Sequence, residues 1–283
     1  MTKTTKITIV FMTLMVVFAG GVVATNSITV QGSDTLLEMV AVEAGEYMKI
    51  HSQSSIQVTG GGSGTGIAAL LNGTVDVANA SRKIKKKERR KITKDGGKVF
   101  EVAIALDGIT VYLNVKNSVS DLSMNQLRDI YLGKIDNWKE VGGSDAKIIR
   151  YSRENNSGTY VFFKKKVLNR KQYAPDCQNL PGTASVVHAV SKDKNGIGFG
   201  GISYGEGIKF ARINGVVPSA KTISAGEYPI SRNLYQYTIN KPEGLSKKFI
   251  AFELSKIGQQ LAEKAGYIPL SESQRKESLA MLN

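Results

Sequence analysis

The sequence predicts an α/β fold with largely parallel or mixed sheets, because strand patterns alternate with helical patterns along the chain. Three times, a short strand pattern runs into a turn rich in Gly, Ser and Thr and then into a helical pattern. The chain has 283 residues, of which 41% are hydrophobic and 22% charged. That is enough for one large globular domain or for two lobes of ordinary size.

The three copies of this pattern predict three strand and helix pairs: 27–30 with 35–48, 55–58 with 65–71, and 148–151 with 159–168. In the first helix, apolar residues from Leu36 to Met48 recur at helical spacing. Ligands of open α/β sheets bind beyond the carboxyl ends of the strands. All three turns lie at such ends, so we expect a ligand there.

The remaining strands are predicted at 75–79, 101–106, 109–113, 196–204 and 234–239. Gly108 separates two of them, which suggests a bend where the chain changes lobe. The strand 234–239 would return the chain to the first lobe. One long final helix is predicted at 246–264, with Gly266 placed to end it.

The N-terminus has the layout of a secretory signal peptide. Lys3 and Lys6 precede an uncharged apolar stretch, 7–23, which ends in small residues at Ala24. We therefore predict a signal peptide over 1–24 and a periplasmic or other extracytoplasmic location. An uncleaved membrane anchor is the alternative. No cysteine lies near the cleavage region, so a lipoprotein is not expected.

Little in the sequence indicates metal, cofactor or redox chemistry. Cys177 is the only cysteine, so no intramolecular disulfide can form. His51 and His188 stand alone and have no zinc-ligand spacing. No Ser/His/Asp set or catalytic carboxylate pair is apparent. We predict no catalytic residue, no metal and no cofactor.

The formal net charge is +14, of which Lys3 and Lys6 supply two. Such a field attracts anions and anionic surfaces. The densest basic run, 83–91, reads KIKKKERRK. It is either a solvated helix face or a contact for anionic lipid or a cell-envelope polymer. No recognised motif or interleaved aromatic surface accompanies it, so nucleic acid is not an expected partner.

The three turns have the features of an anion site. A helix N-terminus leaves backbone N–H groups unpaired and has a partial positive charge. Glycine lets the backbone approach a ligand, and hydroxyl groups add donors. One such turn is weak evidence, because Ser and Thr are ordinary helix caps. Three together indicate an oxyanion site. The candidates from the turns are Ser33, Thr35, Ser63, Ser157, Gly158 and Thr159.

Charged residues close to these strand ends narrow the range of possible ligands. Arg153 lies four residues before Ser157, and Arg82 follows Ser81 at another strand end. A guanidinium presents forked donors that match an oxyanion. Asp107 would repel an anion unless the ligand supplies a proton. Near neutral pH, phosphate keeps a proton and sulfate keeps none, so an acid here would select phosphate.

Taken together, these motifs resemble the phosphate-binding proteins of phosphate ABC transporters, the PstS family of the periplasmic-binding-protein superfamily. The matching stretches, in order, are QGSDTL from Gln31, GGGSGTGIAALLNGTVDVANASRKIK from Gly60, ALDGITVYLN from Ala105, RENNSGT from Arg153, YPISRNLY from Tyr228 and GYIPL from Gly266. They extend over nearly all of the chain after the predicted signal peptide.

The resemblance implies the two-lobed, type II periplasmic-binding-protein fold, in which each lobe is a mixed sheet flanked by helices and two crossover strands join the lobes. One lobe would comprise 25–106 and 237–283, and the other 107–236. The implied function is to capture inorganic phosphate between the lobes and to deliver it to the membrane permease subunits of an ABC transporter. We expect a monomer that is not an enzyme.

The resemblance also implies which residues contact phosphate. The expected contacts are Ser33, Thr35 through its hydroxyl and N–H, the Leu36 N–H, Ser63, Ser81, Arg82, Arg153, Ser157, Gly158 and Thr159, with Asp107 accepting the phosphate proton. One position departs from the family pattern. An acid commonly stands two residues after the turn arginine and holds it, but here Asn155 occupies that position. Glu154 is the candidate substitute.

Two other functions stay open at this stage. One is an envelope-binding or adhesive protein that uses the basic face. The other is an exported phosphatase that uses the same anion site.

Overall fold

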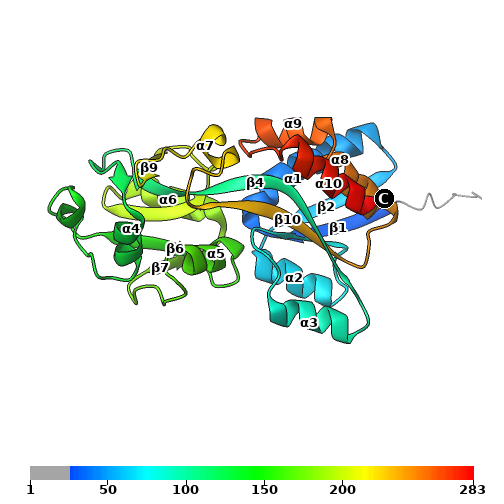
Figure 1. Ribbon diagram of the computed structural model, residues 1–283, viewed down its shortest axis with the longest axis horizontal. Coiled ribbons are helices and arrows are strands. Elements are labelled where there is room, and N and C mark those ends of the chain that lie inside the picture. Colours follow the sequence, from blue (N-terminus) through cyan, green and yellow to red (C-terminus); the bar gives the residue numbers. More distant parts are fainter. Residues whose placement is uncertain (1–25) are drawn as a thin grey trace, which may run out of the picture.

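Two long strands, β4 (Val99–Asn114) and β10 (Ser231–Ile239), run from one half of the molecule to the other and join two α/β lobes (Figure 1). The computed structural model describes residues 26–283, so the predicted signal peptide lies outside the described residues. The two strands pair antiparallel, with Asp107 opposite Arg232 and Val99 opposite Ile239. Within residues 26–283, no helix combines the length and hydropathy that crossing a membrane requires.

The first lobe is built on a mixed sheet in the order β2-β1-β3-β10-β4. Its other strands are β1 (Asn26–Gly32), β2 (Ser54–Thr59) and β3 (Val77–Ala80). Its helices are α1 (Asp34–Ile50), α2 (Ser63–Leu71), α3 (Lys86–Lys94), α8 (Gly244–Glu253), α9 (Lys256–Lys264) and α10 (Glu272–Leu282). Helices α2 and α3 cover one face of the sheet, and the other four cover the opposite face (Figure 1).

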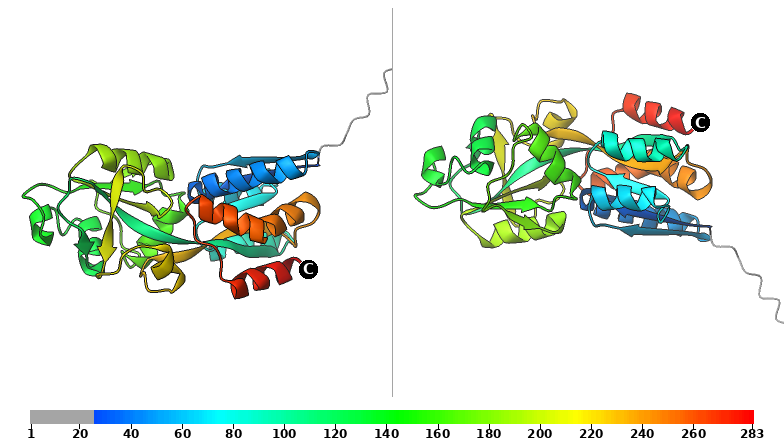
Figure 2. Two further views of the ribbon diagram at one scale, coloured as in Figure 1. Left: turned by 90° about the horizontal axis from the view of Figure 1, so that it is seen from above. Right: turned by 90° about the horizontal axis from the view of Figure 1, so that it is seen from below.

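The second lobe continues along β4 in the order β4-β8-β6-β7, with β9 also paired to β4. Its strands are β5 (Asp121–Leu122), β6 (Ile149–Arg153), β7 (Gln178–Leu180), β8 (Gly196–Gly201) and β9 (Ile208–Ile213). Its helical elements are α4 (Met124–Tyr131), the 3-10 helix η1 (Trp138–Val141), α5 (Gly158–Lys166), α6 (Gly182–Lys192) and α7 (Ala220–Ser224). Figure 2 shows this lobe at the opposite end of the long strands from the C-terminus.

Each lobe has its own buried core, and the long strands pass from one core to the other. On β4, Ala105 packs in the first lobe and Ile109 in the second. On the return, Ile230 packs in the second lobe and Leu234 in the first. The cores thus change over on both strands beside Asp107 and its partner. We propose that the returning lobe limit lies between Ile230 and Leu234, and the limits at 106/107 and 236/237 stay predictions.

The predicted α/β class and the three strand–turn–helix copies are confirmed as β1-α1, β2-α2 and β6-α5. The two strands predicted on either side of Gly108 are one, because β4 continues through it as a single strand of 16 residues, although the chain does pass from one core to the other there. The glycine instead permits close packing, since a Cβ atom there would lie 2.3 Å from Cδ1 of Ile223. The strand predicted at 196–204 ends earlier, at Gly201.

The single helix predicted at 246–264 is also wrong, because the structure has two helices there, α8 and α9. The Ser255 hydroxyl caps the second helix by accepting a hydrogen bond of 3.1 Å from the Gly258 N–H. A Cβ atom at Gly258 would lie 2.3 Å from the carbonyl oxygen of Phe252. One apolar stripe fits both arrangements, so periodicity alone does not reveal the break.

Two buried carboxyl groups face each other in the first lobe, Glu43 on α1 and Glu253 on α8. Burial, together with the neighbouring Glu253 carboxylate, raises the pKa of Glu43 well above its ordinary value. Burial also raises the pKa of Glu253, whose Oε1 accepts a hydrogen bond of 3.0 Å from Gln236. The folded protein therefore holds a proton at this pair that the unfolded chain releases.

We predict that this pair makes stability fall as pH rises. Above the ordinary carboxyl pKa of 4.5 the unfolded chain has lost the proton, so each further unit of pH favours unfolding until the raised pKa is passed. The Glu253→Gln variant removes one of the two charges and should flatten this dependence. Urea unfolding at about pH 5 and about pH 8 measures the effect. The exposed Glu263→Gln variant is the control, and equal pH dependence in all three proteins would contradict the prediction.

Candidate functional site

The polar ends of four chain segments meet between the lobes: the starts of α1, α2 and α5, and the end of β3. The Ser33 hydroxyl donates to Ser81 Oγ at 2.8 Å, and the Ser81 N–H donates to Ser63 Oγ at 3.0 Å. Across the lobes, the Thr35 and Thr159 hydroxyl oxygens lie 3.0 Å apart. All five side chains are buried. We call this group of hydroxyls, with the groups bonded to it, the cradle.

Gly158, the first residue of α5, brings the second lobe against the first-lobe hydroxyls. A Cβ atom there would lie 2.2 Å from Ser63 Oγ and 2.5 Å from Ser81 Oγ. Only glycine allows this approach, so the start of α5 is part of the cradle as predicted from the third turn. Ser157 caps α5, and its hydroxyl accepts from the Tyr160 N–H at 3.3 Å. The Leu36 N–H donates to the Ser33 carbonyl at 3.0 Å inside the first turn.

The central charge of the cradle is Arg232, which the sequence analysis did not single out. Its Nη2 donates to Asp107 Oδ2 at 2.7 Å and to Thr159 Oγ1 at 3.0 Å. Its Nη1 donates to the Ser81 carbonyl at 2.8 Å. The sequence did contain a signal, because Arg232 lies in the YPISRNLY stretch, two residues from Ile230 on one side and from Leu234 on the other.

Asp107 and Arg232 form a buried ion pair on neighbouring strands. Burial raises the pKa of the Asp107 carboxyl, and the Arg232 guanidinium opposes that rise. Burial likewise lowers the pKa of Arg232, and Asp107 opposes that change. The second carboxylate oxygen of Asp107 accepts from the Ile202 N–H at 3.3 Å. Asp107 thus holds Arg232 in place. The sequence predicted only that Asp107 accepts the phosphate proton, and it did not predict this contact.

Arg153 lies buried at the edge of the cradle and is held from both lobes. Its Nη2 donates to Asp34 Oδ2 at 2.6 Å, and its Nη1 donates to the Thr183 hydroxyl at 2.7 Å. The suggestion that Glu154 replaces the missing acid is therefore wrong. Glu154 and Asn155 are both exposed, and the acid comes from the first helix of the other lobe.

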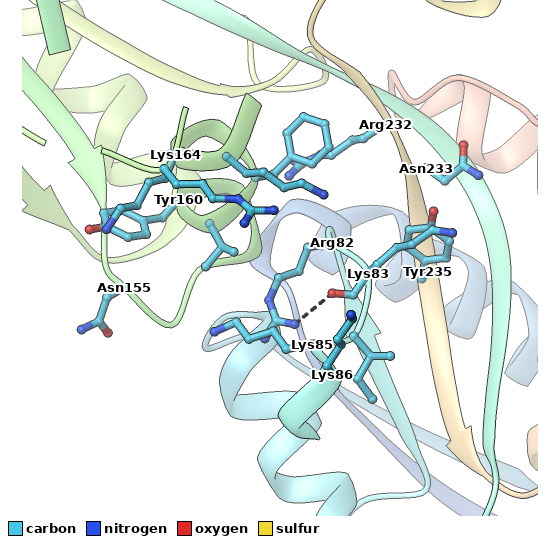
Figure 3. Close-up of a pocket in the computed structure, with 15 residues that line it drawn as sticks. Arg82, Lys83, Lys85, Lys86, Asn155, Tyr160, Lys164, Arg232, Asn233 and Tyr235 are labelled. Atoms are coloured by element: carbon cyan, nitrogen blue, oxygen red, sulfur yellow. Dashed lines mark hydrogen bonds between the residues drawn. The ribbon is translucent and has the colours of Figure 1, made fainter. Parts of the chain in front are cut away.

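Arg82 is also buried, but its guanidinium binds Glu88 through two hydrogen bonds, of 2.8 and 2.7 Å. Much of its charge is therefore balanced within the first lobe. Arg82 lines a groove beside the cradle, together with several lysines (Figure 3).

Further contacts join the lobes around the cradle. The Gly64 N–H donates to the Asn156 carbonyl at 2.8 Å, and the Asn156 amide donates to the Gly61 carbonyl at 3.1 Å. On the other side, the Tyr204 hydroxyl donates to the Asp34 carbonyl at 2.7 Å. Both lobes thus contact each other directly on either side of the cradle.

The groups of the cradle suit an anion. Hydroxyls, guanidinium groups and helix N-termini all offer hydrogen-bond donors or positive charge. Between residues 26 and 283 there is no group of three or more His, Cys, Asp or Glu side chains that could hold a metal ion. The donors and positive charges that are present favour recognition of a small, negatively charged oxygen compound.

This fold and site define a class, the two-lobed solute-binding proteins. A family model described as a PBP superfamily domain matches residues 21–256, and the chain belongs to that superfamily. Phosphate-binding protein PstS of Pseudomonas aeruginosa is 34% identical over 267 residues, covering 84% of this chain and 81% of the relative. The Bacillus subtilis PstS is 32% identical over 253 residues, covering 88% and 82%. The chain is thus a member of the PstS family, as the motifs predicted.

Solved structures show the same likeness. A phosphate ABC transporter substrate-binding protein from Clostridium perfringens, with bound phosphate, has a TM-score of 0.82 and 31% identity, covering 87% of this chain and 100% of that one. An ABC-type phosphate transport receptor from Vibrio cholerae has a TM-score of 0.72 and 29% identity, covering 86% and 100%. The predicted periplasmic-binding-protein fold is confirmed.

We predict that Arg232→Met destabilises the protein, because Asp107 is then left buried without a counter-charge. Such a loss costs roughly 3–5 kcal/mol of unfolding free energy. The double variant Asp107→Asn with Arg232→Met removes both charges and should recover much of the lost unfolding free energy. Urea unfolding measures all three proteins. A single variant as stable as the parent would show that the pair is solvated in solution.

Proposed function

We propose that this protein binds inorganic phosphate between its lobes, outside the cytoplasmic membrane, and delivers it to the permease subunits of an ABC transporter. The names of its PstS relatives and the phosphate bound in the Clostridium perfringens structure support phosphate as the ligand. The phosphate transport receptor from Vibrio cholerae supports the transport setting.

One observation carries the proposal: donors from both lobes converge on a single buried place. The first lobe contributes Ser33, Thr35, Ser63 and Ser81, and the second contributes the start of α5 with Gly158 and Thr159. A tetrahedral oxyanion has acceptor lone pairs in all directions, so donors on every side suit it. Because the place is buried, the anion would be bound without its hydration shell and needs many hydrogen bonds to compensate.

Arg232 and Arg153 would supply the counter-charge, while Asp107 sets the selectivity. The Nη2 atom of Arg232 lies within hydrogen-bond distance of Asp107, Thr159 and, at 3.4 Å, the Thr35 hydroxyl. The Asp107 carboxylate is therefore close to any anion in the cradle. It would accept a hydrogen bond from protonated phosphate and repel sulfate, which has no proton.

Capture and release would follow from lobe closure. Ligand contacts made by both lobes stabilise the arrangement in which the lobes touch, so binding shifts the population toward it. A permease that recognises both lobes together would then bind the loaded form. We propose that a single copy of the chain does this after export by the N-terminal segment, and that it is not an enzyme.

Calorimetric titration of ligand-stripped protein with phosphate tests this function. We expect one phosphate per chain in the parent. The Arg153→Ala variant should lose roughly 3–5 kcal/mol of binding free energy, because a buried anion loses a counter-charge. The Arg212→Ala variant removes an exposed arginine of the same lobe and should bind normally. Absence of phosphate binding by folded parent protein would overturn the proposal.

The same samples test the phosphatase alternative. Release of product from a chromogenic phosphate ester by the parent, and its loss in Arg153→Ala, would favour an exported phosphatase. We expect no release above that of a buffer blank.

We predict that Asp107→Asn narrows the preference for phosphate over sulfate. The variant keeps the size of the side chain but no longer repels a fully ionised anion, so sulfate should gain relative to phosphate by roughly tenfold or more. Titration of each anion into the parent, Asp107→Asn and the exposed control Asp145→Asn measures the ratio. If the ratio is the same in all three proteins, Asp107 serves only to hold Arg232.

A further inference from the structure

A large basic groove lies beside the cradle, between the segment that leads into α3 and the helix α5 (Figure 3). Its volume is about 1140 Å³, far more than a single phosphate occupies. Arg232 forms part of its floor and connects it to the cradle, because the same guanidinium binds Thr159 and Asp107. The groove is thus a neighbour of the phosphate site and not the site itself.

Both lobes line this groove with cations. The first lobe contributes Lys83, Lys85 and Lys86, and the second contributes Lys164, Lys165 and Arg170. Among the described residues that line the groove, none is acidic. Carboxylates bonded to or close to the lining residues also have other partners: Glu88 binds Arg82 and Asp107 binds Arg232. Glu101 lies 3.9 Å from Lys83 and 3.5 Å from Arg89.

Arg82 gives a second sign of a ligand. Its side chain is only 4% exposed, yet its Nε has no hydrogen-bond partner among the described residues. The two Nη atoms bind Glu88, so Nε is the donor left over on a buried group that lines the groove. A buried donor of this kind is costly to leave unpaired. An anion oxygen would pair this donor if the Arg82 side chain turned toward the groove.

The repulsion between these cations would be relieved by a bound anion. When the lobes touch, positive groups of both lobes line one groove. Lys164 donates to Gln172 and Lys83 lies 3.9 Å from Glu101, which leaves Lys85, Lys86, Lys165 and Arg170. Like charges repel, and water and salt screen the repulsion only in part when the charges lie within a Debye length of each other. An anion with several charges, bound to both lobes at once, would replace that repulsion with attraction.

The chemistry of the groove favours a chain of phosphoryl groups over a nucleotide. Tyr160 already stacks on Tyr173 at 4.6 Å, and the Arg232 guanidinium lies 5.6 Å from the Phe162 ring centroid. Tyr235, the third ring that lines the groove, is only 8% exposed and its ring centroid lies 6.0 Å from that of Tyr237. These rings are therefore engaged and do not offer a free platform for a base. The cradle cannot take such a chain, because it is buried on all sides and Gly158 fits against its hydroxyls without room for a substituent.

We propose that the groove is a second anion site that binds condensed phosphate, a linear chain of phosphoryl groups, while the cradle holds a single phosphate. The site extends beyond the proposed function and does not require it. A condensed phosphate that contacts Lys86 of one lobe and Lys165 of the other favours the same lobe contact as phosphate in the cradle. The two ligands therefore strengthen each other's binding, and this coupling is reciprocal.

Calorimetry with tripolyphosphate, at low salt, tests the site in the full chain. Tripolyphosphate is titrated into ligand-stripped protein and into protein saturated with inorganic phosphate. We expect one tripolyphosphate per chain in both cases, bound more tightly when phosphate is present. The Lys86→Ala, Lys165→Ala double variant should bind it roughly tenfold more weakly. The Lys192→Ala, Lys194→Ala double variant loses the same charge from an exposed region outside the groove and should match the parent.

Three outcomes would overturn the proposal. The first is no binding of tripolyphosphate by either sample. The second is loss of binding in phosphate-saturated protein, which would mean that tripolyphosphate enters the cradle. The third is equal weakening in both double variants, which would show a response to net charge and not to a site. The proposed phosphate-binding function fails separately, if the protein does not bind inorganic phosphate. In that case the titration of ligand-stripped protein with tripolyphosphate still tests the groove.

Discussion

The buried ion pair between Asp107 and Arg232 is the interaction on which the rest of the site depends. One residue lies on each of the two strands that join the lobes, directly opposite the other in the β4–β10 ladder. The backbone register therefore sets the pair before any ligand binds. In turn it fixes the guanidinium where it reaches Ser81 of one lobe and Thr159 of the other. A buried charge is tolerated here because its partner is placed by the sheet itself.

A steric constraint acts on the same place. Ser63 and Ser81 belong to the first lobe and Gly158 to the second, and their closest approach leaves no space for a Cβ atom. The hydroxyls can therefore surround a small ligand only when α5 reaches them. A cradle made in this way is complete only while the lobes touch, which is the physical reason for expecting binding and lobe contact to be coupled.

The sequence predicted the parts of this protein that depend on local signals. Period and turn composition placed β1-α1, β2-α2 and β6-α5, and with them four of the five hydroxyl residues of the cradle; the fifth, Ser81, follows β3. It missed contacts that depend on distant parts of the chain. Arg232 binds Asp107 across 125 positions, and Arg153 binds Asp34 across 119. The nearest acid, Glu154, was the natural candidate from sequence, but its backbone leaves it facing solvent. The break between α8 and α9 was missed because an unbroken apolar stripe fits both forms.

The structure also divides the positive charge of the chain into two kinds. Each buried arginine has a carboxylate partner within hydrogen-bond distance: Arg82 with Glu88, Arg150 with Asp136 and Asp176, Arg153 with Asp34, and Arg232 with Asp107. Their charges are thus largely balanced where they lie. The uncompensated charge is left mainly to exposed lysines and to exposed arginines such as Arg170, and several of these cations line the groove next to the cradle. An anion that approaches from solution therefore meets several unpaired cations at the groove, so its association should be fast and should slow as salt screens them.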